Sequence, residues 1–299
     1  AMGRYRGVRR LDEAVRTHLS RQLADVLSFY SGGIALRLRT YVSRWDIRNV
    51  RSILRDLTRR GQQSPSIATL VTAGAFDAQA LEEVAAQRDV RAAVDLLSVW
   101  GLPSPAVVRQ LRHAMPAFVE TGDVLVLERA LDEGLGKIVR AAQDDGDLVS
   151  RFLAREIDRT NLMSLLRLRG DAGPATVAAD VSPVAGGSVS PNVWADLADV
   201  DDATLAEQLA HRLAVTWRPA ITEWFEHRDL ARLETSLDHA AAVESIALFR
   251  TGDPLGIEIP LGFIGQQEAE AANLRLIGRA VTHDLDREET FGRLLGVVV

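Results

Sequence analysis

The sequence predicts an all-α protein built from three similar helical units, and two observations support this prediction. Along six long stretches, apolar residues recur at i, i+3, i+4 and i+7 with charged residues on the opposite face, which is the period of an amphipathic helix. In addition, three of the four asparagines of the chain, Asn49, Asn161 and Asn273, lie 112 residues apart within similar sequence.

The helical period runs through residues 8–27, 34–57, 106–118, 124–139, 148–168 and 230–249. Ser104 followed by Pro105 predicts a capped helix start, because serine accepts from free backbone N–H groups and proline fits the first helical position. Only residues 256–260 suggest a short extended segment. Alternating apolar and polar residues do not form a series with hairpin turns, so the all-α class is favoured.

The repeated pattern is an acid, two residues, Asn, a branched aliphatic residue, two residues, Leu or Ile, one residue and Arg. An aromatic residue precedes each copy, at Tyr41, Phe152 and Phe263. A Leu-Glu-x-x-Leu-Asp signature at 127–132 and 233–238 precedes the second and third copies. We interpret the pattern as a threefold duplication with a period of 112 residues, defined by Asp46, Asn49 and Arg55, by Asp158, Asn161 and Arg167, and by Glu270, Asn273 and Arg279.

The period divides the chain into units at 1–60, 61–170 and 171–299, with a Gly/Pro-rich loop at 170–191 before the third. The first unit is then shorter than the second by roughly fifty residues at its front. We expect this unit either to be short by nature or to be truncated, and a truncated start is favoured.

The acid and the asparagine of each copy are expected to fix helix packing. At 100° per residue, Asp46 and Asn49 lie on the same apolar stripe as Val50 and Ile53, whereas Arg55 points away. Buried polar groups must be hydrogen-bonded, so we expect them to bind free backbone groups at a neighbouring helix end. A metal site or acid–base catalysis is the alternative. A metal site would require the three units to converge, which separately packed units do not readily do. Catalysis would require a second titratable partner, and none recurs with the repeat.

The sequence predicts no catalytic, cofactor or metal site. Cysteine is absent, which excludes disulfides, thiolate catalysis and cysteine zinc sites. The chain has no phosphate-binding loop, dinucleotide fingerprint, nucleophile elbow or His-Glu-x-x-His motif. Trp217 and Trp224, seven residues apart, could anchor a partner, but packing in a core is favoured. We therefore expect a protein that is not an enzyme.

Positive charge is concentrated at the start of the chain. Residues 1–60 contain 14 Arg and 5 Asp or Glu, a net charge of +9, whereas the net charge of the whole chain is −6. A solvated arginine-rich helix face explains this excess most simply, and anionic lipid or nucleic acid are the alternatives. Aromatic residues are sparse there and no nucleic-acid motif occurs, so no nucleic-acid partner is predicted.

The repeat-bearing passages 41–55, 152–169 and 260–275, together with a closing helix pair at 276–295, resemble the C-subunit family of archaeal and bacterial V-type (A/V-type) ATPases, related to the d subunit of the eukaryotic enzyme. The resemblance implies three helical units around a pseudo-threefold axis, forming a funnel. Its wide face would rest on the membrane rotor ring, and its cavity would receive the tip of the central shaft.

Such a protein would be a non-catalytic socket for ATP-coupled proton or sodium transport, on the cytoplasmic face of the cell membrane. Its partners would be the shaft subunits and the rotor ring, with no cofactor and no small-molecule substrate. The resemblance identifies no individual shaft contact. The alternative is an α-helical repeat adaptor that binds a protein or peptide in its concave face.

Overall fold

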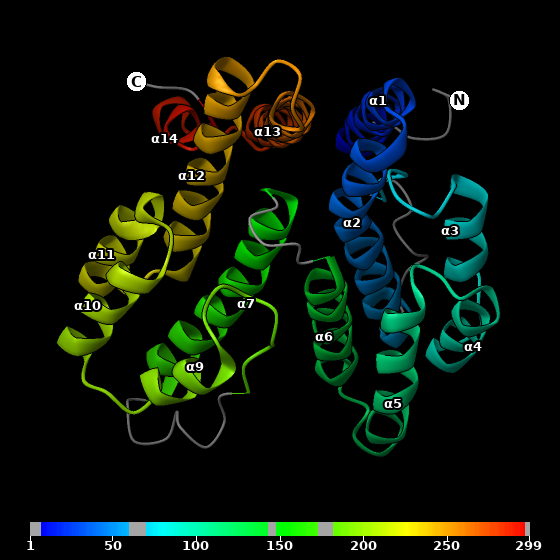
Figure 1. The fold of residues 1–299 in the computed structure, drawn as a ribbon, viewed down its shortest axis with the longest axis horizontal. Coiled ribbons are helices and arrows are strands. Elements are labelled where there is room, and N and C mark those ends of the chain that lie inside the picture. Colours follow the sequence, from blue (N-terminus) through cyan, green and yellow to red (C-terminus); the bar gives the residue numbers. More distant parts are fainter. Residues whose placement is uncertain (1–6, 60–69, 143–147, 173–181, 297–299) are drawn as a thin grey trace.

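The computed structural model describes residues 7–59, 70–142, 148–172 and 182–296, and every regular element in these ranges is helical (Figure 1). This confirms the all-α class. The elements are α1 (Val8–Phe29), α2 (Gly32–Thr58), α3 (Ala78–Ala85), α4 (Val90–Trp100), α5 (Pro105–Thr121), α6 (Val124–Ala142), α7 (Leu148–Ala172), α9 (Pro191–Leu197), α10 (Asp202–Arg212), the 3-10 turn η2 (Val215–Trp217), α11 (Arg218–His227), α12 (Leu230–Thr251), α13 (Glu258–His283) and α14 (Arg287–Gly292).

The six predicted helical stretches correspond to α1, α2, α5, α6, α7 and α12. Ser104 caps α5 as predicted, because its side chain accepts from the N–H of Val107 at 3.3 Å. The extended segment predicted at 256–260 is wrong, since α13 begins at Glu258. Pro260 fits there because the first N–H groups of a helix have no intrahelical partner, so a missing one costs nothing.

Two predicted connections fall partly outside the described residues. The unit boundary at 60/61 lies there, as do residues 173–181 of the predicted loop 170–191. The helix α7 continues through the start of that loop to Ala172, and residues 182–190 are not helical.

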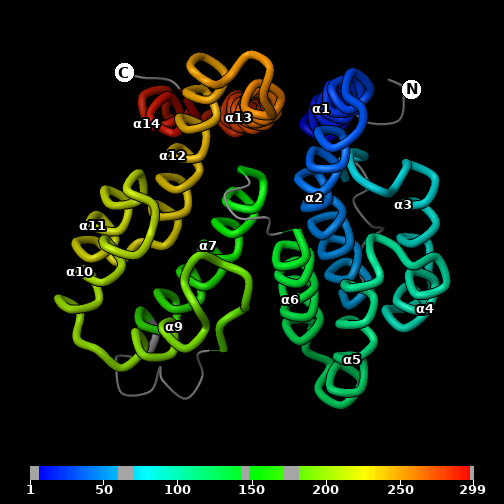
Figure 2. The backbone as a smooth tube through the Cα atoms, viewed as in Figure 1, coloured from blue at the N-terminus to red at the C-terminus, as the bar shows by residue number. Residues whose placement is uncertain are grey.

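The short helices lie outside the long ones (Figure 1). The group α3–α5 covers the outer side of α2 and α6, and the group α9–α11 covers α7 and α12. Figure 2 traces how the chain passes from the first group to the second and returns with α13 beside α1. The last long helix, α13, packs against both α12 and α1. The first helix of the chain and its last long helix therefore lie side by side.

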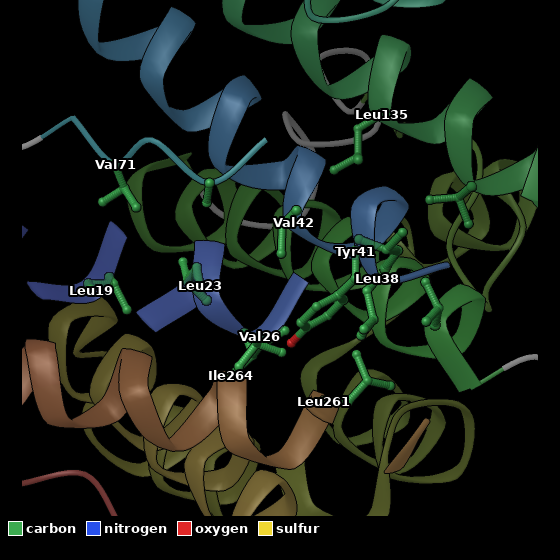
Figure 3. Close-up of a cluster of buried hydrophobic side chains, with 14 of the residues drawn as sticks. Leu19, Leu23, Val26, Leu38, Tyr41, Val42, Val71, Leu135, Leu261 and Ile264 are labelled. Atoms are coloured by element: carbon green, nitrogen blue, oxygen red, sulfur yellow. The ribbon is translucent and has the colours of Figure 1, made fainter. Parts of the chain in front are cut away.

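Three hydrophobic clusters hold these elements together. One is formed by α2 to α6 and another by α7 to α12. The third joins α1, α2, α6, α7 and α13, and Figure 3 shows side chains from four of these helices meeting there. Trp217 and Trp224 are both buried in the cluster of α7 to α12, in agreement with a packing role.

The three helices that carry the repeated asparagines differ in how their apolar faces are covered. Ile53, Leu165 and Ile277 occupy the same position of the 112-residue period. Ile53 is 1% exposed and Leu165 is 0% exposed, because α3–α5 and α9–α11 cover them. Ile277 of α13 is 42% exposed and Val281 is 79% exposed. The neighbouring α14 has only six residues and leaves this stripe open to solvent.

Candidate partner-binding cavity

Each repeated asparagine ties its helix to a segment that follows later in the chain. Its side-chain amide donates to the carbonyl and accepts from the N–H of one residue 22 or 23 positions onward, at distances between 2.7 and 3.0 Å. The pairs are Asn49 with Val71, Asn161 with Val184, and Asn273 with Leu295. Both backbone groups of the partner residue are therefore satisfied by one side chain.

The repeated acids act on the same segments in two of the three copies. Asp46 accepts from the N–H of Ala75 at 2.8 Å, and Asp158 accepts from the N–H of Ser188 at 2.9 Å. Glu270, by contrast, is exposed and accepts from Gln267 at 3.4 Å. The partners of the first two acids are loop residues after the helix, not the end of a neighbouring helix.

Glycine makes the close approach of these loops possible. A Cβ atom on Gly74 would lie 1.9 Å from a carboxylate oxygen of Asp46, and one on Gly187 would lie 2.1 Å from Asp158. Any side chain at either position would displace the carboxylate from its hydrogen bonds.

Burial perturbs both carboxyl groups. It raises the pKa of Asp46 to about 6, although hydrogen bonds from the N–H groups of Ala75 and Phe76 oppose this shift. Burial likewise raises the pKa of Asp158, opposed mainly by Ser188. The charged form of Asp46 is thus less stable in the folded chain than in the unfolded chain. Its contribution to the free energy of unfolding decreases as the pH rises through 6.

The repeated arginines do not share one role. Arg55 forms an ion pair with Glu128 of α6, beside a second pair between Arg51 and Asp132. Arg167 and Arg279 are exposed.

A more deeply buried arginine, Arg169, was not predicted. It donates to the carbonyls of Leu197 and Ala198 at 3.1 and 3.0 Å and lies 3.3 Å from a carboxylate oxygen of Asp202. In the sequence, its burial is indicated only by its position on the apolar stripe of α7, one turn after Leu165.

The three long helices meet five residues before their asparagines, at Arg44 of α2, Glu156 of α7 and Glu268 of α13. Arg44 is 3% exposed and donates to both carboxylate oxygens of Glu268 at 2.7 and 2.8 Å. Trp45 also donates to Glu268, at 2.7 Å. None of the acid–Asn pairs takes part in this meeting point.

These residues surround a cavity of about 240 Å³ between α2, α7, α12 and α13. Tyr41, Trp45, Phe152 and Trp217 form aromatic parts of its wall. Its charged lining consists of five arginines (Arg44, Arg48, Arg155, Arg159 and Arg275) and four carboxylates (Glu156, Asp238, Glu244 and Glu268). Four of the arginines are ion-paired with these carboxylates: Arg44 with Glu268, Arg48 with Glu156, Arg155 with Glu244 and Arg159 with Asp238. The fifth, Arg275, forms a longer ion pair of 4.0 Å with Asp12 of α1.

The pairing sets the protonation of the lining. Burial would raise the pKa of Glu156, but Arg48, Arg44 and Arg159 outweigh this effect and lower it to about 2. Burial raises the pKa of Tyr41 to about 12. At neutral pH Glu156 is therefore ionised and Tyr41 is uncharged. Among the described residues, no three His, Asp or Glu side chains are grouped as a metal site would require.

Comparison with known proteins decides the family. Residues 1–291 match the sequence profile of the ATP synthase (C/AC39) subunit family. The chain belongs to this family.

Relatives of the ATP synthase (C/AC39) family align with nearly the whole chain. The C subunit of the V-type ATP synthase of Deinococcus radiodurans is 29% identical over 95% of this chain and 74% of its own length. The C subunit of the A-type ATP synthase of Halorubrum lacusprofundi is 27% identical over 97% of this chain and 82% of its own. For the C subunit of the V-type ATP synthase of Thermus thermophilus the identity is 26%, over 95% of this chain and 81% of that protein.

Membership confirms the resemblance seen in the repeat-bearing passages. It also identifies the chain as a structural, non-catalytic subunit of an ATP synthase complex. The interactions of such a protein are with other subunits of the complex.

Proposed function

We propose that this protein couples the rotating central shaft of a V-type ATPase to the membrane rotor ring, and that the end of the shaft binds in the cavity where α2, α7 and α13 meet. The observation that carries this proposal is the convergence of three similar helices on one preformed, ion-paired cavity. A socket for a rotating part needs such a site at the junction of its units.

The size and lining of the cavity favour a polypeptide as its occupant. Its volume of about 240 Å³ lies below the range of about 300–1,000 Å³ that is typical of small-molecule sites. A cavity of this size fits the side chains at the tip of an inserted segment. Aromatic walls and fixed charges are also frequent where proteins bind one another.

The proposal includes the three-unit organisation. It divides the chain into units at 1–60, 61–170 and 171–299, arranged as a funnel around the cavity. The shared contacts of Asn49, Asn161 and Asn273 support the 112-residue repeat, and those of Asn49 and Asn161 reach across the unit boundaries to Val71 and Val184. The wide side of the funnel would face the rotor ring, on the inner face of the cell membrane. In the described part of the chain, no helix combines the length and apolar character needed to cross a bilayer.

Gel filtration with the shaft subunits of the same ATPase tests the proposal. We expect the wild-type chain to co-elute with the shaft in a stoichiometric complex, and a detergent-solubilised rotor ring to join that complex. Arg48→Glu, in the cavity wall, should abolish co-elution, whereas Arg88→Glu, on the exposed turn between α3 and α4, should not. A wild-type chain that binds neither shaft nor ring would refute the proposal.

A further inference from the structure

The charged side chains in the cavity wall all have a partner of opposite charge. Four of the five arginines pair with the four carboxylates of the wall. The fifth, Arg275, pairs with Asp12 of α1 at 4.0 Å. A charged side chain that entered the cavity would have to compete with one of these pairs, and separating a partly buried pair leaves a charge without its partner. The wall therefore disfavours a charged side chain inside the cavity.

Several hydrogen-bond donors of the wall are also occupied or out of reach. The indole Nε1 of Trp45 donates to Glu268 at 2.7 Å, and the hydroxyl of Ser245 donates to a backbone carbonyl at 2.9 Å. Arg44 and Arg275 have nitrogens without a hydrogen-bond partner, but those atoms have almost no accessible surface. None of these donors is available to an entering group.

Four helices contribute apolar surface to the same cavity. Trp45 of α2 and Phe152 of α7 provide two aromatic rings, and Ala241 of α12 and Ala272 of α13 provide two small side chains. The two rings and Ala272 are half-buried, and Ala241 is exposed. A larger side chain at either alanine position would occupy part of the cavity volume of about 240 Å³.

We propose that the end of the shaft inserts an uncharged, apolar side chain between the two rings and the two alanines. This inference rests on the proposed function, which places the end of the shaft in this cavity. Burial of an apolar side chain against aromatic and aliphatic groups is favourable and requires no ion pair to separate.

The ion pairs would keep their present partners when this side chain enters. They join α2 to α13, α2 to α7 and α7 to α12. They therefore hold the helices around the inserted side chain, and the apolar groups between them supply the contact.

The first test fills the cavity and measures binding of the full chain to the shaft subunits of the same ATPase. Ala272→Leu and Ala241→Leu should each weaken binding at least about 10-fold, because the added side chain takes the place of the inserted one. The melting temperature of the free chain should stay close to that of the wild type. Ala24→Leu is the matched control, because Ala24 is exposed on α1 and does not line the cavity, and it should change binding less than about threefold.

The second test separates the ring of Trp45 from its hydrogen bond. Trp45→Ala should weaken binding about 10- to 100-fold, as loss of an aromatic contact at the centre of an interface does. Trp45→Phe keeps an aromatic ring and loses the donor to Glu268, so it should change binding less than about threefold. Equal losses in the two variants would assign the effect to the hydrogen bond and overturn this inference.

Replacing the residues at the end of the shaft by alanine, one at a time, should identify the inserted side chain. One apolar residue should weaken wild-type binding when replaced and have no further effect on Ala272→Leu, which shows direct coupling. Absence of wild-type binding would overturn the proposed function and this inference together. Wild-type binding with unchanged affinity in both cavity-filling variants would overturn this inference alone, and so would coupling of Ala272→Leu to a charged residue of the shaft.

Discussion

Replacement of Asn161 by alanine tests whether the repeated asparagine holds the fold together. The side chain of Asn161 is 5% exposed and makes two hydrogen bonds to Val184, at 2.9 and 2.8 Å. Val184 itself is 5% exposed, so water cannot readily replace the lost partner. The carbonyl and the N–H of Val184 would each lose their partner, at a cost of about 1–3 kcal/mol per group. Part of this cost is offset, because the amide of Asn161 no longer has to be desolvated. We therefore expect Asn161→Ala to lower the free energy of unfolding by about 2–4 kcal/mol.

Urea denaturation followed by circular dichroism measures this change, and hydrogen exchange at the amide of Val184 locates it. The exchange protection of that amide should fall together with the urea midpoint. Asn192→Ala is the matched control, because Asn192 is the asparagine outside the repeat and is exposed on α9. Its effect should stay within about 0.5 kcal/mol. Equal midpoints for the two variants would refute the assigned role of Asn161.

Three further changes test the buried charges and the exposed stripe. The pKa of Asp46 is about 6 in the folded chain and 3.8 ordinarily, so this carboxyl group should lower the wild-type free energy of unfolding as the pH rises from about 4 to about 6. Asp46→Asn should reduce that fall, as measured by urea titrations at the two pH values. Glu268→Gln leaves Arg44 buried without its carboxylate and should cost about 3 kcal/mol or more in the same urea assay. Leu165→Ala should cost about 2–5 kcal/mol, whereas Ile277→Ala, at the same repeat position but 42% exposed, should cost less than about 1 kcal/mol by thermal unfolding.

The helices could be predicted because they depend on apolar residues that recur at a regular spacing. The apolar stripe of α7 is readable from Leu162, Leu165 and Leu166, and all three are fully buried. Asn161 lies on that stripe, so the period alone indicated a polar group in need of partners. The partner itself could not be predicted, because Val184 lies 23 residues later in a segment without a repeating pattern.

The cavity could not be predicted because its key position changes chemistry from copy to copy. Arg44, Glu156 and Glu268 occupy one position of the 112-residue period, yet one is basic and two are acidic. A search for positions that hold the same residue type in all three copies does not find this position. Complementary charge, however, is what lets three similar helices meet at one point, since three copies of the same charge would repel one another. The difference between the copies is thus a condition of their convergence.

The acid–Asn pairs and the central core contribute differently to the fold. Hydrophobic burial is non-directional, so packing among α1, α2, α6, α7 and α13 does not by itself fix where the segments around Val71 and Val184 lie. The two hydrogen bonds of Asn49 to the single residue Val71 are directional and fix the position of that residue against α2. Asn273 is only half-buried and its loop lacks the second tie that Asp46 and Asp158 supply, so the third of these ties is the weakest. The segment around Leu295 is therefore held less firmly than the segments around Val71 and Val184.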